Sequence, residues 1–237
     1  MDNSAEALTA AKRAAGYEAA GMIKDGMVLG LGTGSTVFFA LERLSLRISE
    51  GLQVSGVPTS FQTARLAREY GIPLTTLDQD PELDLAIDGA DQVDKNFFCI
   101  KGRGAALTRE KCVAAAALRF LVIIDEQKFV PYLSAPVPVE VIPFAARPVM
   151  TQLEDLGCRA VLREGIKKDG PVITDNGNFV VDCSFSEIDD PSEIEKAIKI
   201  LHGVVDSGLF CGFTQKTTVI VGNQKKCRVI TSPDIIA

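Results

Sequence analysis

The sequence MVLGLGTGST, residues 27–36, decides which type of fold the chain can adopt. Residues 27–31 are an apolar run with the length of a buried strand, and a glycine-rich turn follows at once. Beyond the turn, apolar residues recur at helical spacing, at Val37, Phe38, Leu41, Leu44 and Ile48. A buried strand, a tight turn and an amphipathic helix form the repeating unit of α/β folds, so this stretch predicts an α/β protein.

The glycine-rich turn, residues 30–36, also has the composition of a phosphate-binding loop. Glycines let the backbone approach an anion closely, and the free N–H groups and hydroxyls at a helix start can then point at it. The turn is not a dinucleotide fingerprint, because Ser35 stands where the third glycine is needed, and no Gly-Lys-Ser/Thr follows to make a P-loop. The alternative is a purely structural turn in which Ser35 or Thr36 caps the helix.

Strand and helix patterns alternate through the first half of the chain. Such alternation predicts a mostly parallel sheet flanked by helices, which is a Rossmann-like arrangement. The patterns place strands at 53–57, 74–77, 83–87 and 120–124, and helices at 4–21, 60–70 and 106–118.

The pattern changes near Pro131, Pro136 and Pro138, which suggest a domain junction. Beyond them the order β-α-β-β-α-β predicts a second, smaller α+β domain of the ferredoxin-like kind. Its elements are expected at 139–142, 146–156, 159–163, 179–183, 191–202 and 204–205. Asn176-Gly177 favours a type I′ hairpin turn. Two final strands, at 218–221 and 227–230, can return to the first sheet.

Composition narrows the class of partner. The chain has 237 residues, 46% of them hydrophobic and 24% charged, with a net charge of -6, as in an ordinary globular protein. No segment rich in Lys and Arg predicts a nucleic-acid partner, and no apolar run has the length of a membrane span. The six cysteines form no C-x-x-C pair, and residues 1–6 show no secretory signal, so we expect reduced core thiols in a cytoplasmic protein.

Charged side chains gather where predicted strands end. The apolar run 83–87 leads into Asp88-Gly89-Ala90-Asp91, and Lys101-Gly102-Arg103-Gly104 precedes a helix start with Thr108-Arg109-Glu110-Lys111. Lys128 follows the strand at 120–124. Ligands of open α/β sheets bind at the carboxyl ends of the strands, so this arrangement predicts an active site. Two solvated turns and a charged helix end are the alternative.

The residue types favour proton transfer on a small phosphorylated molecule. The chain has one histidine, His202, and therefore lacks a multi-histidine metal site. A carboxylate can remove a proton from carbon beside a carbonyl, and Lys101 or a protonated acid can stabilise the oxygen anion that forms. Glu110 lies near a helix start, which lowers a carboxyl pKa, whereas burial raises it. The sequence leaves open which effect prevails.

Four segments together resemble ribose-5-phosphate isomerases of type A. They are GLGTGST (30–36), DGAD (88–91), KGRGAALTREK (101–111) and PVEVIPF (138–144). The resemblance covers almost the whole chain and includes TDNGN (174–178) and GVVDSGLF (203–210). It implies interconversion of ribose 5-phosphate and ribulose 5-phosphate through an enediolate, in the non-oxidative pentose phosphate pathway, without a metal or organic cofactor.

The resemblance also implies residue roles. Glu110 corresponds to the base that moves the proton between C1 and C2. Asp88 and Asp91 correspond to the acids that assist ring opening and proton movement between oxygens. Lys101 corresponds to a substrate-binding lysine. The remaining expected substrate-binding residues are Thr33, Gly34, Ser35, Thr36, Gly89, Ala90, Gly102, Arg103, Gly104 and Lys128.

The family fold implies a discontinuous catalytic domain, here 1–131 plus 208–237, and a lid or dimerisation domain at 132–207, in a homodimer or homotetramer. Arg103 and Gln92 depart from the expected pattern of glycine and glutamate. Arg103 adds bulk and positive charge to its loop.

Three other classes of protein are the alternatives. A sugar-phosphate-binding regulator of this fold would need a DNA-binding module, which the acidic chain and its single short N-terminal helix do not supply. A CoA-transferase-like enzyme would use a glutamate nucleophile, and hydroxylamine would trap its acyl-CoA thioester. A nicotinamide dehydrogenase is disfavoured by the missing third glycine.

Overall fold

The computed structural model describes residues 3–224 and 226–231. The chain divides into two compact units. The first unit contains Met1–Ala90, Arg109–Phe129 and Phe213–Ala237, and the second contains Asp91–Thr108 and Val130–Gly212.

The first unit is built on a six-stranded sheet in the order β13-β12-β6-β3-β1-β2. All neighbouring strands are parallel except β13, which pairs antiparallel with β12. The central strands β1, β3, β6 and β12 are mostly apolar and mostly buried, as expected for strands that are covered on both faces. The bounds are β1 Val28–Leu31, β2 Ser55–Pro58, β3 Leu83–Gly89, β6 Ala117–Asp125, β12 Thr217–Gly222 and β13 Cys227–Thr231. The predicted mostly parallel, Rossmann-like sheet is confirmed.

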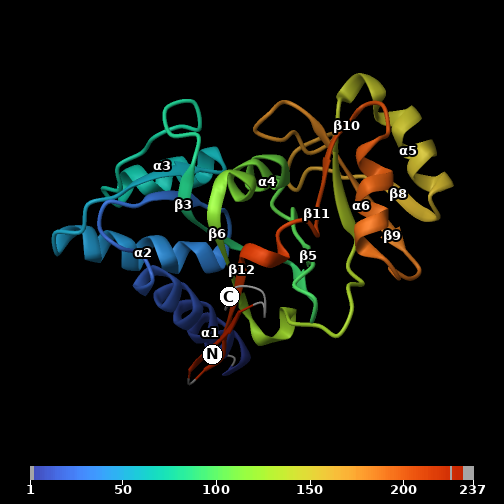
Figure 1. Ribbon diagram of the computed structural model, residues 1–237. Coiled ribbons are helices and arrows are strands. Elements are labelled where there is room, and N and C mark those ends of the chain that lie inside the picture. Colours follow the sequence, from blue (N-terminus) through green and yellow to red (C-terminus); the bar gives the residue numbers. More distant parts are fainter. Residues whose placement is uncertain (1–2, 225, 232–237) are drawn as a thin grey trace. The chain divides into compact units, whose positions relative to one another are not determined.

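Helices cover both faces of this sheet (Figure 1). Leu29 and Leu31 of β1 point to the face where they share a core with α1 and α2. Gly30 points to the opposite face, where a Cβ atom on it would overlap Val113 of α4. The bounds are α1 Asn3–Gly21, α2 Ser35–Ser49, α3 Phe61–Glu69, α4 Leu107–Ala116, and the short 3₁₀ helices η1 Glu126–Lys128 and η3 Thr214–Lys216. Side chains of even-numbered residues in β1 and β3 therefore face α4.

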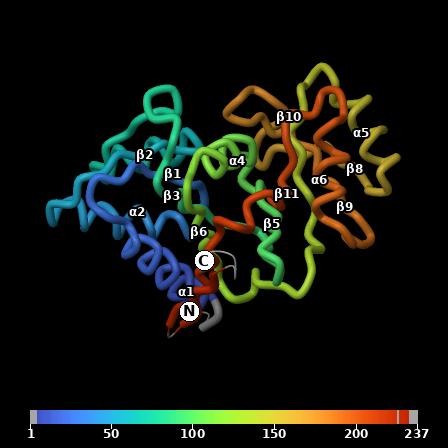
Figure 2. The backbone as a smooth tube through the Cα atoms, viewed as in Figure 1, coloured from blue at the N-terminus to red at the C-terminus, as the bar shows by residue number. Residues whose placement is uncertain are grey.

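The N-terminal helix and the last two strands belong to the first unit. Strand β12 pairs with β6 in register from Thr217↔Phe120 to Gly222↔Asp125. Figure 2 shows the N-terminal helix α1, in blue, beside the C-terminal strands, in red. The predicted return of the last two strands to the first sheet is confirmed.

The second unit contains an antiparallel sheet in the order β10-β7-β9-β8. Helices α5 and α6 pack on one face of it, against alternate residues such as Val139 and Val181. Pro138, Glu140 and Asp182 alternate with these and belong to the other face. The bounds are β7 Val137–Val141, η2 Pro143–Ala145, α5 Ala146–Asp155, β8 Cys158–Leu162, β9 Phe179–Phe185, α6 Pro191–Lys199 and β10 Val204–Ser207. This is the predicted β-α-β-β-α-β order.

A small sheet, β11-β5-β4, completes the second unit. Its strands are β4 Gln92–Val93, β5 Cys99–Ile100 and β11 Leu209–Phe210. The pairing of β5 with β11 ties residues 91–108 to the second unit, whereas the expected division placed them in the first. Sequence patterns are local, and this contact joins segments more than 100 residues apart.

Two local predictions were wrong. The strand expected at 74–77 is only an isolated bridge between Leu74 and Gly56. The turn at Asn176-Gly177 is not type I′, because only Gly177 has a positive φ, of 81°. The Gly177 N–H donates to Thr174 O instead, as in a three-residue loop that ends in a left-handed glycine.

Within the described residues, no helix combines the length and the apolar character that a membrane crossing requires.

Candidate active site

The expected site residues fall in both units. The first unit carries Glu110, Lys128, the glycine-rich turn 33–36 and residues 88–90. The second carries Asp91 and residues 101–104.

In the first unit, Asp88 is anchored to the glycine-rich turn. Asp88 lies near the carboxyl end of β3 and is 3% exposed. Its Oδ1 accepts hydrogen bonds from the backbone N–H groups of Thr33, at 3.1 Å, and Gly89, at 2.7 Å. A Cβ atom on Gly32 would overlap this carboxylate, so only glycine allows the turn to approach it so closely. Asp88 and the turn therefore form one structural group.

The Thr33 hydroxyl belongs to a cluster that the sequence patterns did not reveal. Its Oγ1 lies 2.8 Å from Thr59 Oγ1, 2.8 Å from Ser60 Oγ and 3.1 Å from Thr63 Oγ1. These three residues follow β2, so another strand's carboxyl end supports the turn. The available signal was Pro58-Thr59-Ser60, a pair of hydroxyl residues at a strand end.

The start of α2 suits an anion. Gly34 is the N-cap residue, and no side chain forms a cap hydrogen bond there. The alternative of a turn capped by Ser35 or Thr36 is therefore wrong. Gly34 and Ser35 are exposed while Thr36 is buried. A helix start with backbone N–H groups and the positive end of the helix dipole can bind an anion.

Glu110 lies in the first turn of α4 and is only 5% exposed. Val113, three residues later on the same side of the helix, contacts Gly30 of β1. A helix that connects two parallel strands runs back along the sheet, so Glu110 lies one turn closer to the strands' carboxyl ends than Val113. Asp88 faces the same side of the sheet. Both acids therefore belong to one buried face of the first unit.

Lys128 supports the turn that follows β3. It ends η1, directly after β6, and its Nζ donates to the carbonyl oxygen of Ala90 at 2.6 Å. Strand β6 is the neighbour of β3, with Ile123 opposite Gly89. The expectation that Lys128 comes from an adjacent strand end therefore agrees with the structure.

In the second unit, Lys101 is nearly inaccessible, at 2% exposure. Its backbone N–H donates to Gly208 O at 2.9 Å, which extends the pairing of β5 with β11. Its ammonium nitrogen lies 5.3 Å from the ring centroid of Phe210. A cation over an aromatic face is attracted by the ring quadrupole, so this contact positions the charge.

Asp91 and the loop after Lys101 interact directly. Asp91 Oδ2 accepts from the Arg103 N–H at 3.0 Å, and Asp91 Oδ1 lies 3.8 Å from Arg103 Nε. The Arg103 side chain is 77% exposed, so its ion pair is a weak, solvent-screened contact, and the backbone bond is the firmer one.

Gln92, the other departure from the expected pattern, ties β4 to a neighbouring loop. Its Oε1 accepts from the backbone N–H groups of Ser134, at 2.8 Å, and Ala135, at 2.9 Å. A carboxylate oxygen could accept the same two bonds. The contact with Ser134 and Ala135 therefore does not depend on whether position 92 holds glutamine, as here, or the expected glutamate.

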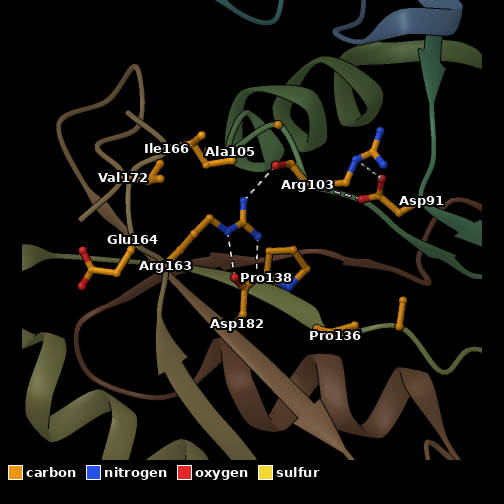
Figure 3. A pocket seen from close by; sticks show the side chains of 12 residues that line it. Asp91, Arg103, Ala105, Pro136, Pro138, Arg163, Glu164, Ile166, Val172 and Asp182 are labelled. Carbon is orange, nitrogen blue, oxygen red and sulfur yellow. Dashed lines mark hydrogen bonds and ion pairs between the residues drawn. The ribbon is translucent and has the colours of Figure 1, made fainter. Parts of the chain in front are cut away.

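A cavity of about 680 Å³ lies beside this loop (Figure 3). Its lining within the second unit includes Asp91 and Arg103, and also Arg163 and Asp182, which no sequence motif singles out. Arg163 lies just past the end of β8 and Asp182 on β9. Nothing in the local sequence marks either residue, because their partners are distant along the chain.

Among the described residues, no group of three or more His, Cys, Asp or Glu side chains is arranged to hold a metal ion.

Comparisons with known proteins agree on one family. The family model of ribose 5-phosphate isomerase A (phosphoriboisomerase A) matches residues 55–226. Ribose-5-phosphate isomerase A of Methanoregula boonei is 64% identical over 236 residues, which cover 100% of both chains.

Two solved structures share the fold closely. Ribose 5-phosphate isomerase A of Methanocaldococcus jannaschii aligns with a TM-score of 0.88 and 46% identity, covering 93% of this chain and 97% of that one. A D-ribose-5-phosphate isomerase in complex with phospho-erythronic acid aligns with a TM-score of 0.89 and 45% identity, with the same coverage. The chain belongs to the ribose 5-phosphate isomerase A family.

Proposed function

We propose that the chain interconverts D-ribose 5-phosphate and D-ribulose 5-phosphate through an enediolate, with Glu110 as the carbon base. The observation that carries the proposal is the arrangement of the first unit. Two buried acids, Glu110 and Asp88, belong to one face of the sheet, and Asp88 is bonded to the turn that opens α2. A relative solved with phospho-erythronic acid supports a ligand that carries a phosphate group.

The proposed reaction begins with the open-chain sugar. Glu110 removes the proton from C2 of the aldose and returns it to C1, which converts the aldehyde into the ketose. Negative charge develops on the carbonyl oxygen in between, and Lys101 stabilises it. Asp88 and Asp91 assist ring opening and move protons between oxygens.

The start of α2, residues 33–36, supplies binding energy for the phosphate without itself taking part in the chemistry. Residues 89–90, 102–104 and Lys128 complete the proposed set of substrate-binding positions. In this proposal some residues bind the substrate and the acids transfer protons. Variants of the acids should therefore change kcat more than KM.

Deuterium incorporation tests the proposed function. EDTA-treated protein is incubated with ribose 5-phosphate in D₂O, and proton NMR follows the products. Ketopentose phosphate with deuterium entering at carbon is the expected result, because an enediolate exchanges its proton with solvent through the base. Folded protein that gives no product would contradict the proposal and favour a sugar-phosphate-binding role. Product without deuterium would contradict an exchanging enediolate.

Replacement of Asp88 by Asn should lower kcat about 100-fold while the protein stays folded. The amide oxygen can still accept from Thr33 N and Gly89 N, so the turn keeps its anchor, but the side chain can no longer take up a proton. The measurement is steady-state kinetics together with thermal unfolding.

Asp84→Asn is the matched control for this variant. Asp84 lies at the other end of β3, and its Oδ2 accepts from the backbone N–H of Val28, at 2.8 Å, in the same manner. We expect its kcat to remain near that of the wild type. Equal losses in the two variants would show that Asp88 acts only as a structural anchor.

The assembly and the compartment are also proposals. We propose a homodimer or homotetramer in the cytoplasm, with residues 132–207 serving as the lid or dimerisation domain and 1–131 plus 208–237 as the catalytic one. Sedimentation velocity of the purified chain would measure the assembly directly.

A further inference from the structure

We propose that Arg163 is a positioning residue, which holds the loop after Lys101 and, through that loop, orients the Asp91 carboxylate. The inference rests on the proposed function only for the role of Asp91. All the contacts that carry it lie within the second unit (Figure 3).

The guanidinium of Arg163 joins a carboxylate to the loop. Its Nε donates to Asp182 Oδ2 at 2.8 Å, and its Nη2 donates to Asp182 Oδ1, which makes a two-pronged ion pair. Its Nη1 donates to the carbonyl oxygens of Gly102 and Arg103, both at 3.0 Å. Bidentate, charge-assisted bonds of this kind have defined geometry as well as strength.

The support behind Arg163 is a β-hairpin. Its backbone N–H donates to Val180 O at 2.8 Å, which continues the pairing of β8 with β9. Asp182 itself lies within β9, opposite Val161. The side chains of Arg163 and Asp182 are 17% and 29% exposed, so solvent weakens their pair less than it weakens a surface ion pair.

The loop that Arg163 holds has an unfavourable backbone. Gly102 has φ of 102°, and Ala105, which has a side chain, has φ of 59°. Residues in such conformations persist when the surrounding structure holds them there. Gly208 holds one side of the loop through Lys101 N, and Arg163 holds the other side through two consecutive carbonyls.

The loop in turn fixes Asp91. The Arg103 N–H donates to Asp91 Oδ2 at 3.0 Å, and the carbonyl of the same residue accepts from Arg163. A continuous path of bonds therefore leads from Asp182 through Arg163 and Arg103 to Asp91. Lys101 is held separately by Gly208 and Phe210, so it does not depend on Arg163.

This separation predicts which kinetic constant changes. Loss of the Arg163 side chain should release the loop and misplace Asp91 while leaving Lys101 in position. Small misplacements of catalytic groups cost up to about 100-fold in rate. For Arg163→Ala we expect kcat to fall about 10- to 100-fold and KM to change by less than about threefold. Arg163→Lys keeps the charge but not the planar fork, and we expect a loss of about fivefold.

Arg159→Ala is the matched control. Arg159 lies four residues earlier, on β8, and its exposed side chain has no hydrogen bond or ion pair within the described part of the chain. We expect its kcat and KM to match those of the wild type. Added guanidinium chloride, at millimolar concentration, should restore part of the kcat of Arg163→Ala in a saturable way, because the cavity of about 680 Å³ gives it access to the vacated position. It should not raise the kcat of Arg159→Ala.

Hydrogen–deuterium exchange measures the loop without reference to activity. In Arg163→Ala, the amides of residues 102–105 should exchange faster than in the wild type, whereas the exchange rates of the Lys101 amide, which Gly208 holds, and of the β12 amides should not change. If that variant fails to fold, the same comparison is made with Arg163→Lys.

Specific results would overturn the inference. Unchanged exchange at 102–105 would show that Arg163 does not hold the loop, and a kcat within twofold of the wild type would show that catalysis does not need this support. A loss confined to KM would contradict a role through Asp91. If the wild type itself lacked isomerase activity, the proposed function would fail, but exchange at 102–105 would still decide whether Arg163 holds the loop.

Discussion

Replacement of Glu110 by Gln is expected to lower kcat about 1000-fold, which corresponds to about 4 kcal/mol of transition-state stabilisation. Glutamine has nearly the same shape but cannot accept a proton from carbon. Glu110 is 5% exposed in the first turn of α4, so water has little access to replace it as the base. The binding of ribose 5-phosphate, measured by calorimetry, should change little, because the proposed phosphate site at the start of α2 is untouched.

Glu126→Gln makes the same chemical change at an exposed position. Glu126 follows β6 in the first unit and is exposed, so we expect wild-type kinetics. Turnover near the wild-type value in Glu110→Gln would remove Glu110 as the base. Loss of binding together with loss of turnover would instead indicate a role in holding the substrate.

Gly32→Ala is expected to impair both stability and activity. The added methyl group would overlap Asp88 Oδ1 and would lie 2.6 Å from Ile87 O, so the turn and the carboxylate must separate. We expect a loss of about 2 kcal/mol in the free energy of unfolding, the range of overpacked sites. The bond from Thr33 N to Asp88 should be lost as well, with kcat/KM about 100-fold lower. Urea unfolding and steady-state kinetics measure the two effects.

Gly21→Ala provides the comparison. Gly21 ends α1 and does not have a positive φ, and its added methyl group would meet no described heavy atom within 4 Å beyond its chain neighbours and the adjacent backbone of its own helix. We expect its stability to stay within about 0.5 kcal/mol of the wild type, with unchanged kinetics. A Gly32→Ala protein as stable and active as Gly21→Ala would show that the contact between the turn and Asp88 is not needed.

Much of the candidate site could be predicted because its signals are local. The turn at 33–36 lies between β1 and α2. Asp88 lies near the end of β3, and Glu110 lies in the first turn of α4. Apolar periodicity shows these boundaries in the sequence. The structure places Asp88 in contact with the turn and buries Glu110. The roles of these residues in the reaction stay predictions, which the variants above test.

The residues that the sequence patterns did not reveal share one property: their partners are far away in sequence. Arg163 contacts Gly102 O, 61 positions away, and Thr33 meets Thr59, 26 positions away. Neither contact leaves a periodic or compositional trace. The pairing of β5 with β11, which joins residues 91–108 to the second unit, also spans a long separation.

The α/β class, the order of most elements and the β-α-β-β-α-β segment could be inferred from the chain alone, because apolar periodicity and turn residues reflect short-range interactions. The family was inferred from the resemblance of the motifs to known sequences. The assignment of segments to the two units, the burial of Glu110 and the support of the loop after Lys101 became visible in the folded structure. Such properties depend on contacts between distant segments, which form only when the whole chain has folded and which no local pattern records.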